Sequence, residues 1–304
     1  MKDTYDIVFD HKDNKHFNQD LNNLIKRSPN NNFEKWLFKD KQLENFSPIT
    51  IVNEKNEIIA ALGILKFNVF ISGEKCSAVQ IGNFFIKEAY QNENLEEILI
   101  EAAIYKYSNL VDILISYCGV KDEEILKKSG FERRQEYLFF IPWNEKEQTE
   151  SSKLIKLDLS VSHDFELVKE ALLHSSKQSS ILDTKGDSLV KFHNIQKYFE
   201  NDLWYIPSLE TVVCFRIEDG IFDFIASFSS HNVDVNEILN IIVPRGIKRV
   251  DFGFMPDIRE GLHITKTDSF VRTGLDIHSC LYLKEITTGL KDKKYMFPLL
   301  SRQK

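Results

Sequence analysis

Long apolar runs, rich in β-branched and aromatic residues, alternate with short polar breaks between Ile49 and Ile86. The runs are Ile49–Val52, Ile58–Phe70 and Ser77–Ile86. The breaks between them contain the Asn, Gly and Ser residues that favour turns. This pattern predicts three consecutive strands that pair as antiparallel neighbours.

After these strands the spacing between apolar residues changes from that of strands to that of a helix. Apolar residues then recur at helical spacing, at Leu95, Ile98, Leu99, Ala102 and Tyr105. Asn94 and Glu97 are spaced as an N-cap and its reciprocal acid, so a helix should begin here. The segments that follow predict a strand at Asp112–Cys118, a short helix at Asp122–Lys128 and a strand at Phe131–Ile141. The first half therefore has the order β-β-β-α-β-α-β.

A polar, aperiodic stretch between Pro142 and Lys153 is the best candidate for a linker. Beyond it the pattern predicts a helix at His163–His174, a loop over 175–190, a hairpin at Thr211–Phe228, a helix at Val235–Val243 and a strand at Ile247–Phe254. The predicted helix caps Asn94 and Asp234 lie 140 positions apart. We therefore expect two domains, 1–147 and 152–304, that arose by duplication. The alternative is a chance likeness between two α+β halves.

Charge and composition exclude several classes of protein. The 304 residues have a formal net charge of −7, with 42% hydrophobic and 28% charged residues, as in ordinary globular proteins. Neither half is basic, which argues against a protein that binds nucleic acid. No apolar run approaches the roughly 20 residues of a membrane-spanning helix. The N-terminus lacks the apolar core of a signal peptide, so a cytoplasmic location is expected.

Metal and disulfide chemistry have little support in the sequence. The four cysteines, at positions 76, 118, 214 and 280, form no C-x-x-C pair, and we expect them to be reduced. The eight histidines never occur with the spacing of metal ligands. No metal site is therefore predicted.

Two segments carry a family resemblance. The strand and loop Val79–Glu96, with the helix that follows, resemble the central motif of the GCN5-related N-acetyltransferases, and so does Glu124–Glu132. In that superfamily a strand leads into Q/R-x-x-G-x-G/A at a helix start, and a later short helix ends in Tyr-x-x-x-Gly-Phe. The resemblance implies an α/β (α+β) fold with two such domains in tandem, each a mixed, mostly antiparallel sheet with flanking helices. The clear motif lies in the first domain only.

The resemblance also implies a coenzyme site. Glycines in the family loop let the pyrophosphate of coenzyme A approach a helix N-terminus, whose free N–H groups and dipole favour an anion. The matching residues here are Gln91, Asn92, Glu93, Asn94, Leu95 and Glu96, and the backbone N–H groups near Phe85 and Ile86 would polarise the thioester carbonyl. Asn94 and Glu96 replace the two small residues of the motif. The alternative is an ordinary amphipathic helix whose acidic first turn complements its own dipole.

The usual catalytic acid is absent. Counting back from Gly130-Phe131, the position of the family tyrosine that protonates the departing thiolate is Leu126, which has no proton to give. Tyr117 and Cys118, at the end of a predicted strand that faces the acyl site in the family, are the candidates to replace it. The alternative is that both are core residues.

The function that the resemblance implies is transfer of an acetyl group from acetyl-CoA to an amine of a small molecule or peptide. The alternative is a catalytically inactive binding or regulatory protein of the same fold that has lost coenzyme A. Neither nucleic acid nor a membrane is expected as a partner, and a homodimer is left open.

Overall fold

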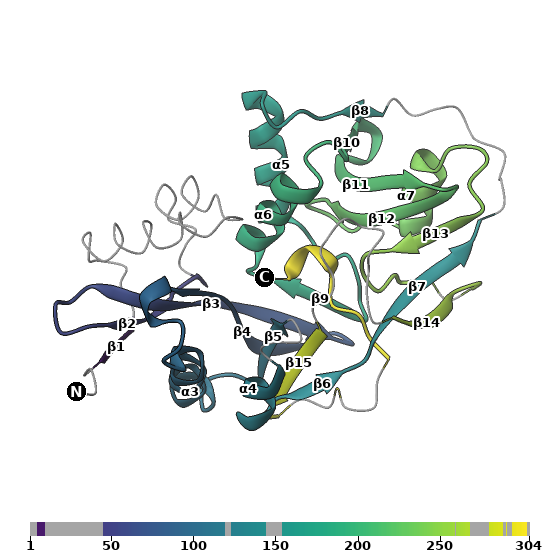
Figure 1. Cartoon of the computed structure of the whole chain (residues 1–304). Coiled ribbons are helices and arrows are strands. Elements are labelled where there is room, and N and C mark those ends of the chain that lie inside the picture. The colour runs from purple at the N-terminus through teal and green to yellow at the C-terminus, as the bar shows by residue number, and fades with distance from the viewer. Residues whose placement is uncertain are drawn as a thin grey trace.

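Two β-sheets with separate helical coverings stack on each other in the computed structural model of the chain (Figure 1). The structure describes residues 5–9, 45–118, 123–143, 154–258, 260–267, 280–287, 290 and 294–302. No helix within these ranges is long and apolar enough to cross a membrane. The α/β fold predicted from the sequence, with two mixed sheets, is confirmed.

The first sheet forms the lower layer of Figure 1. Its strands are β1 (Asp6–Phe9), β2 (Ile49–Val52), β3 (Ile58–Ile71), β4 (Glu74–Ile86), β5 (Ile113–Cys118), β15 (Cys280–Glu285), β6 (Glu132–Arg134) and β9 (Leu182–Lys185). The order is β1-β2-β3-β4-β5-β15-β6, and β9 pairs with the far end of β3. All neighbours are antiparallel except β4 and β5, which are parallel and joined by a helix.

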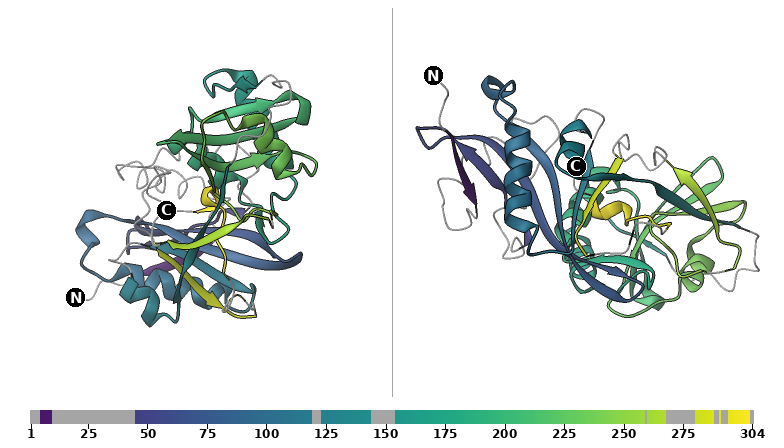
Figure 2. Two further views of the ribbon diagram at one scale, coloured as in Figure 1. Left: turned by 90° about the vertical axis from the view of Figure 1, so that its right-hand side faces the viewer. Right: turned by 90° about the horizontal axis from the view of Figure 1, so that it is seen from below.

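Two helices cover the outer face of this sheet, α3 (Leu95–Tyr107) and α4 (Glu123–Lys128), as the view from below shows for α3 (Figure 2). The helix predicted from Leu95 onward is present, and Leu95, Leu99 and Ala102 are buried against the sheet. The predicted apolar face is wrong at Tyr105, which is 87% exposed. The β3 side chains that point to this face, such as Leu62 and Ile64, complete the core.

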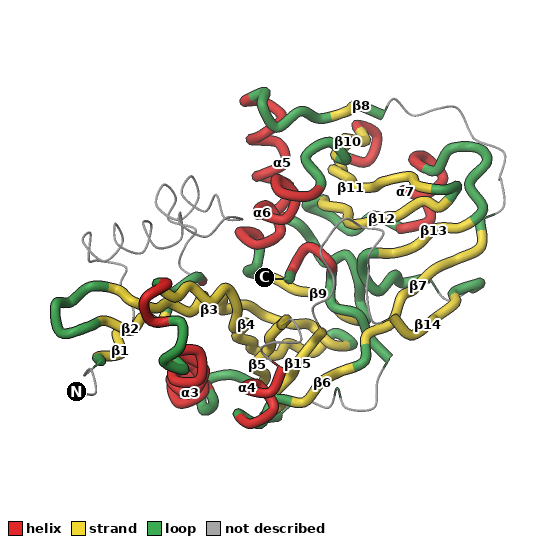
Figure 3. The backbone as a smooth tube through the Cα atoms, in the orientation of Figure 1, coloured by secondary structure: helices red, strands yellow, loops and turns green. Residues whose placement is uncertain are grey.

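The second sheet contains β8 (Ile155–Lys156), β10 (Leu203–Ile206), β11 (Thr211–Glu218), β12 (Ile221–Phe228), β13 (Arg249–Phe252), β7 (Glu136–Pro142) and β14 (His263–Thr267). Their order is β8-β10-β11-β12-β13-β7-β14. The helices α5 (Ser162–His174) and α6 (Ser188–Tyr198) lie at the side of this sheet, and α7 (Val235–Ile242) connects β12 to β13 (Figure 3). The predicted Asp234 cap is present, because its side chain accepts a hydrogen bond from the backbone N–H of Asn236.

The two sheets repeat one topology. Written in sheet order, β1-β2-β3-β4-β5-β15-β6 corresponds strand for strand to β8-β10-β11-β12-β13-β7-β14. In both sheets the fourth and fifth strands are the parallel pair, with a helix between them. The agreement of order and strand direction supports the predicted duplication.

Each sheet contains one or more strands from the other half of the sequence, and β9, which pairs with β3, is one of them. β7 precedes the predicted linker but pairs with β13 and β14 in the second sheet. β15 comes near the C-terminus but pairs with β5 and β6 in the first sheet. The sequence pattern predicts one strand over Phe131–Ile141. Instead Gln135 separates β6 from β7, and the chain passes there from one sheet to the other. The predicted linker itself, 144–153, lies outside the described residues, so the boundaries 1–147 and 152–304 stay predictions.

The space between the sheets is a continuous core. It receives Leu65 and Ile115 from the first sheet, Phe224 and Phe252 from the second, and the C-terminal segment 294–302. Arg302 is 1% exposed in this core and donates two hydrogen bonds to Glu136, of 2.8 and 3.0 Å. The last described residues thereby fix the C-terminus between the two layers (Figure 1).

The segment 175–190, predicted as a loop, contains β9 and the start of α6 instead. Helix α6 is missed by the apolar pattern because two polar residues, Lys191 and Asn194, occupy its buried face. Asn194 donates to the backbone carbonyls of Leu300 and Arg302, at 2.8 and 3.0 Å. Polar contacts with the C-terminal segment therefore replace part of the usual apolar stripe.

Candidate functional site

Strands β4 and β5 separate partway along their length. They pair only from Ala78 to Ile81 of β4, although β4 continues to Ile86. Within the separated part, Asn83 has a φ of 56° and the β3–β4 ladder shifts register, which marks a β-bulge. Beyond the bulge Phe85 and Ile86 pair with β3, and no pairing with β5 occurs in the described residues. The first sheet therefore has an opening between two parallel strands next to the start of α3.

The loop that follows β4 places a residue in the left-handed conformation just before α3. Asn94 has φ 53° and ψ 33°, and its side chain makes no capping hydrogen bond. The prediction that Asn94 and Glu97 form a side-chain cap is therefore wrong. The left-handed conformation turns the backbone as a glycine would, and asparagine tolerates it better than most residues. The first N–H groups of α3 are left without this side-chain acceptor.

The other predicted loop residues surround this helix start. Gln91, Asn92 and Glu93 are exposed, whereas Leu95 is fully buried and anchors the helix. The Tyr5 hydroxyl donates a hydrogen bond to the carboxylate of Glu93. Glu96 lies in the first turn of α3 and is half-buried. The six residues predicted to form a phosphate loop thus lie together at the helix start, and the carboxylate of Glu93 accepts a hydrogen bond from Tyr5, which directly precedes β1.

The two candidate catalytic residues point to opposite faces of the first sheet. Tyr117 packs in the core between the layers, where the guanidinium of Arg302 lies 5.0 Å from its ring centre. Its hydroxyl has no hydrogen-bond partner among the described residues. Burial, helped by the charge of Glu136, raises the pKa of Tyr117 well above its ordinary value. Cys118 instead faces the core beneath α3 and α4. Only one of the two can therefore face a given ligand.

The position of the family tyrosine is also buried. Leu126 is 1% exposed and packs with Phe131 and Leu99 in the core beneath α3 and α4. A tyrosine introduced at this position would have to displace packed side chains, at a cost of about 1–3 kcal/mol. The packing of α4 therefore accommodates a leucine at this position and leaves no room for the tyrosine that is the usual acid.

We expect Tyr117→Phe to leave the free energy of unfolding unchanged or to raise it by about 1 kcal/mol, because it removes a buried hydroxyl without a partner. Urea unfolding would measure this. Any acetyl-transfer activity should be unchanged if Cys118 rather than Tyr117 delivers the proton to the thiolate. A large loss of turnover in a variant that unfolds normally would instead show that the hydroxyl delivers a proton.

The second sheet has the same separation of its parallel strands. β12 pairs with β13 only from Ile221 to Phe224, although β12 continues to Phe228, and the β11–β12 ladder shifts register beside Ile225. The two backbones are in contact where this separation begins, because a side chain at Gly253, directly after β13, would lie 2.5 Å from the carbonyl oxygen of Ile225. The N–H of Gly253 also donates to the carbonyl of Phe224, at 2.8 Å. The strand separation and the bulge therefore belong to the topology that the two sheets share.

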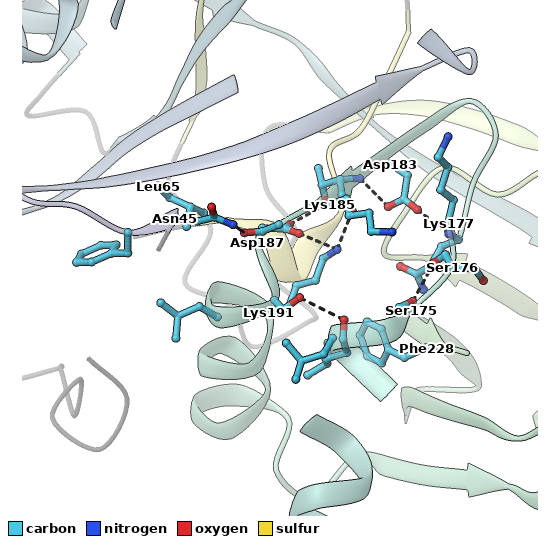
Figure 4. A pocket seen from close by; sticks show the side chains of 18 residues that line it. Asn45, Leu65, Ser175, Ser176, Lys177, Asp183, Lys185, Asp187, Lys191 and Phe228 are labelled. Atoms are coloured by element: carbon cyan, nitrogen blue, oxygen red, sulfur yellow. Dashed lines mark hydrogen bonds and ion pairs between the residues drawn. The ribbon is translucent and has the colours of Figure 1, made fainter. Parts of the chain in front are cut away.

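A cavity of about 460 Å³ lies between the first sheet and the helices α5 and α6 (Figure 4). Phe46 and Leu65 form its wall on the side of the first sheet, and Phe46 packs in one cluster with Phe85 of the β4 opening. Its polar lining comes from Asn45, Ser175, Ser176, Lys177, Gln178, Asp183, Thr184, Lys185, Asp187, Ser188 and Lys191. One wall residue of the cavity, Phe46, thus packs in the same apolar cluster as Phe85 of β4.

Buried charges are held in the cavity wall by a dense network. Lys191 lies 3.1 Å from a carboxylate oxygen of Asp187, and Thr184 donates a 2.7 Å hydrogen bond to the other oxygen. Asp183 accepts from the backbone N–H groups of Gln178 and Thr184, and burial raises the pKa of its carboxyl. Asp183, Thr184 and Asp187 are not predicted from the sequence pattern, because they lie in the segment 175–190 that is predicted as a loop. The available signal was Asp187 directly before the helix that starts at Ser188.

Three solved structures resemble the whole chain. The first is a conserved protein of unknown function from Enterococcus faecalis V583, described as a probable N-acyltransferase. Its alignment has a TM-score of 0.56 and 10% sequence identity, and covers 93% of this chain and 72% of that protein. The second is a GCN5-related N-acetyltransferase from Anabaena variabilis ATCC 29413. Its alignment has a TM-score of 0.53 and 14% sequence identity, and covers 93% of this chain and 73% of that protein. The third is Eis1 from Mycobacterium abscessus. Its alignment has a TM-score of 0.54 and 9% sequence identity, and covers 93% of this chain and 74% of that protein. The chain has the fold of the GCN5-related N-acetyltransferases.

The likeness is one of fold, since no protein-family model and no curated protein matches the sequence. The alignments extend over more than nine-tenths of this chain, so the acetyltransferase fold includes both sheets. Among the described residues, no three His, Cys, Asp or Glu side chains gather in a group that could hold a metal ion.

Proposed function

We propose that this protein is an N-acyltransferase that moves an acetyl group from acetyl-CoA to an amine of a small molecule or peptide. The observation that carries the proposal is the opening between β4 and β5 beside the helix start at Asn94. The duplicated sheet has the same strand separation, but its helix starts at Asp234 with an ordinary side-chain cap and without the family motif. The left-handed helix start at Asn94 is therefore the feature that distinguishes the first half, because the separation itself belongs to the shared topology.

The coenzyme would occupy this opening. The N-terminus of α3 and the loop Gln91–Glu96 would hold the diphosphate, because unpaired N–H groups and the helix dipole attract anions. The backbone N–H groups near Phe85 and Ile86 would polarise the thioester carbonyl. The amine nitrogen would attack the carbonyl carbon, the carbon–sulfur bond would break, and the thiolate would take up a proton. Cys118 and Tyr117 stay the proposed donors of that proton.

The acceptor would enter from the cavity beside Phe46. Phe46 belongs to the same cluster as Phe85, so a ligand in the cavity lies on the side of the sheet from which an amine can approach the opening. The cavity lining carries two carboxylates, Asp183 and Asp187, and three lysines, Lys177, Lys185 and Lys191. Its charge therefore does not favour a cationic acceptor. Positioning of the amine would supply much of the rate. Reactants that are already bound in the reactive orientation lose less translational and rotational entropy in the transition state, which lowers the activation barrier by several kcal/mol.

The proposal is tested at the helix start. A carboxylate about 4 Å from a phosphate oxygen costs on the order of 1 kcal/mol at the dielectric of water and about 4 kcal/mol near a protein surface. We therefore expect Asn94→Gly combined with Glu96→Ala to tighten acetyl-CoA binding about tenfold or more, measured by calorimetric titration. Glycine fits at Asn94 because the backbone there is already left-handed, and alanine keeps the helix propensity.

The matched control is Glu101→Ala, which removes the same charge from an exposed position farther along α3 and should change binding little. If parent and double variant both fail to bind acetyl-CoA at millimolar concentration, the loop is not a phosphate site. The alternative of a protein that keeps the fold without the coenzyme would then hold. A cytoplasmic location and a homodimer stay predictions.

A further inference from the structure

Two cysteines that are 162 positions apart in the sequence lie opposite each other in the first sheet. The register of the antiparallel pair β5–β15 places Cys118 directly across from Cys280. Both side chains are on the face covered by α3 and α4, where Cys118 is buried and Cys280 packs against the same core cluster. Both also contribute to the raised pKa of Tyr282, which lies beside them on that face. The two thiols are therefore neighbours.

We propose that Cys118 and Cys280 form a reversible disulfide under peroxide, a modification that joins the exchanged strand β15 to β5. Directly opposed residues in an antiparallel ladder have Cα atoms about 4.5 or 5.5 Å apart, within the range of about 4.4–6.8 Å that disulfides span. Their Cβ atoms, about 4.5–5.5 Å apart, must approach by roughly 1 Å. Both residues are at strand ends, the last of β5 and the first of β15, where such a movement disturbs few ladder hydrogen bonds.

The exposures of the two thiols set the order of the reaction. Cys280 is partly exposed and Cys118 is 6% exposed, so peroxide reaches Cys280 first. The Cys280 thiolate attacks one oxygen of hydrogen peroxide, the O–O bond breaks, and a sulfenic acid and hydroxide form. The Cys118 sulfur then attacks the Cys280 sulfur, the S–O bond breaks, and the leaving hydroxide takes up the thiol proton to form water. Overall two thiols are oxidised to one disulfide while one peroxide is reduced to two waters.

The remaining cysteines provide internal controls. Cys76 lies across from Val69 on β3, and Cys214 lies across from Ala226 and Leu203 in the second sheet. Neither has a cysteine partner in its ladder. A disulfide that forms without denaturation should therefore contain only Cys118 and Cys280. Such reversible disulfides fit a reducing compartment, where they serve as transient or redox-sensing bonds.

The experiment treats the intact protein with a small excess of hydrogen peroxide, blocks remaining thiols, and then cleaves the chain by limited proteolysis between residues 143 and 153. Cleavage there puts Cys118 and Cys280 on different fragments. In a denaturing gel without reductant we expect the fragments to migrate together near the 35.5 kDa of the intact chain and to separate when reductant is added. Mass spectrometry should find the peptide pair that contains both residues, with the loss of two hydrogen atoms.

Four single variants make the result specific. Cys280→Ser should abolish the linkage, and Cys118→Ser should leave Cys280 as a sulfenic acid that a dimedone probe traps. Cys76→Ser and Cys214→Ser should not change the linkage. The proposal is overturned if the fragments separate without reductant, if the bond persists in Cys118→Ser, or if the product has twice the mass of the chain. None of these readouts depends on acetyl-CoA, so the outcome is independent of the proposed function.

Discussion

Arg302→Ala is expected to lower the free energy of unfolding by about 3–5 kcal/mol at neutral pH, because it leaves the buried carboxylate of Glu136 without its counter-charge. The pair is nearly excluded from solvent, with side-chain exposures of 1% for Arg302 and 6% for Glu136. The lost guanidinium also donates to the carbonyl of Phe297 and lies over the ring of Tyr117. Urea unfolding followed by circular dichroism would measure the change.

The pH dependence gives this prediction a second test. Burial is the main cause of the raised pKa of Glu136, and Arg302 opposes it. A carboxyl whose pKa is raised in the folded state binds more protons there than in the unfolded chain, so its contribution to stability falls as the pH rises through that window. Removing Arg302 raises the folded pKa further. The deficit of the variant should therefore shrink as the pH falls from 7 towards the ordinary pKa of 4.5.

Two controls separate the buried pair from a general charge effect. Lys128→Ala removes one partner of an exposed pair with Glu124 on α4, at 3.2 Å, and should cost less than about 0.5 kcal/mol. Arg302→Met combined with Glu136→Gln removes both charges and should recover much of the loss. If Arg302→Ala unfolds at the same urea concentration as the parent, the ion pair is not enclosed as described.

The sequence was sufficient to predict most local elements of the first half, because apolar runs and turn residues mark where they begin and end. The strand over Phe131–Ile141 is the exception, since the chain changes sheets at Gln135. The strand Ile49–Val52 and the helix from Leu95 agree with the structure. Helix α6 was not predictable in this way, since Lys191 and Asn194 on its buried face are satisfied by contacts with β9 and the C-terminal segment. The spacing of apolar residues within one segment cannot predict contacts that the segment makes with a distant part of the chain.

The candidate site shows the same division. The phosphate-loop candidates are consecutive in sequence, so a motif could locate them, and the structure places them together at the helix start. The cavity draws Phe46, Asp183 and Phe228 from three separate stretches, and only the tertiary fold brings these together. The burial of Tyr117 depends on the C-terminal Arg302, which no pattern near residue 117 could reveal.

Separating the chain at the predicted linker is expected to abolish cooperative folding of both pieces. Residues 1–147 alone would lack β15, which lies between β5 and β6, and would carry β7 without its neighbours β13 and β14. Residues 152–304 alone would lack β7, leaving a gap between β13 and β14. Each piece would expose apolar strand surface, such as Phe139 and Ile141 of β7, that is buried in the intact protein.

Co-expression of the two pieces should restore folding, because the exchanged strands then find their partners. We expect a one-to-one complex in size-exclusion chromatography, with thermal unfolding close to that of the intact chain, whereas each piece alone should aggregate or show no cooperative transition. The intact protein cleaved between residues 143 and 153 serves as the control, since it starts from the folded state and should stay associated without denaturant. A cooperative, soluble fold of either piece alone would mean that its sheet closes without the exchanged strand, and that the two halves are independent domains in the sense expected from the sequence.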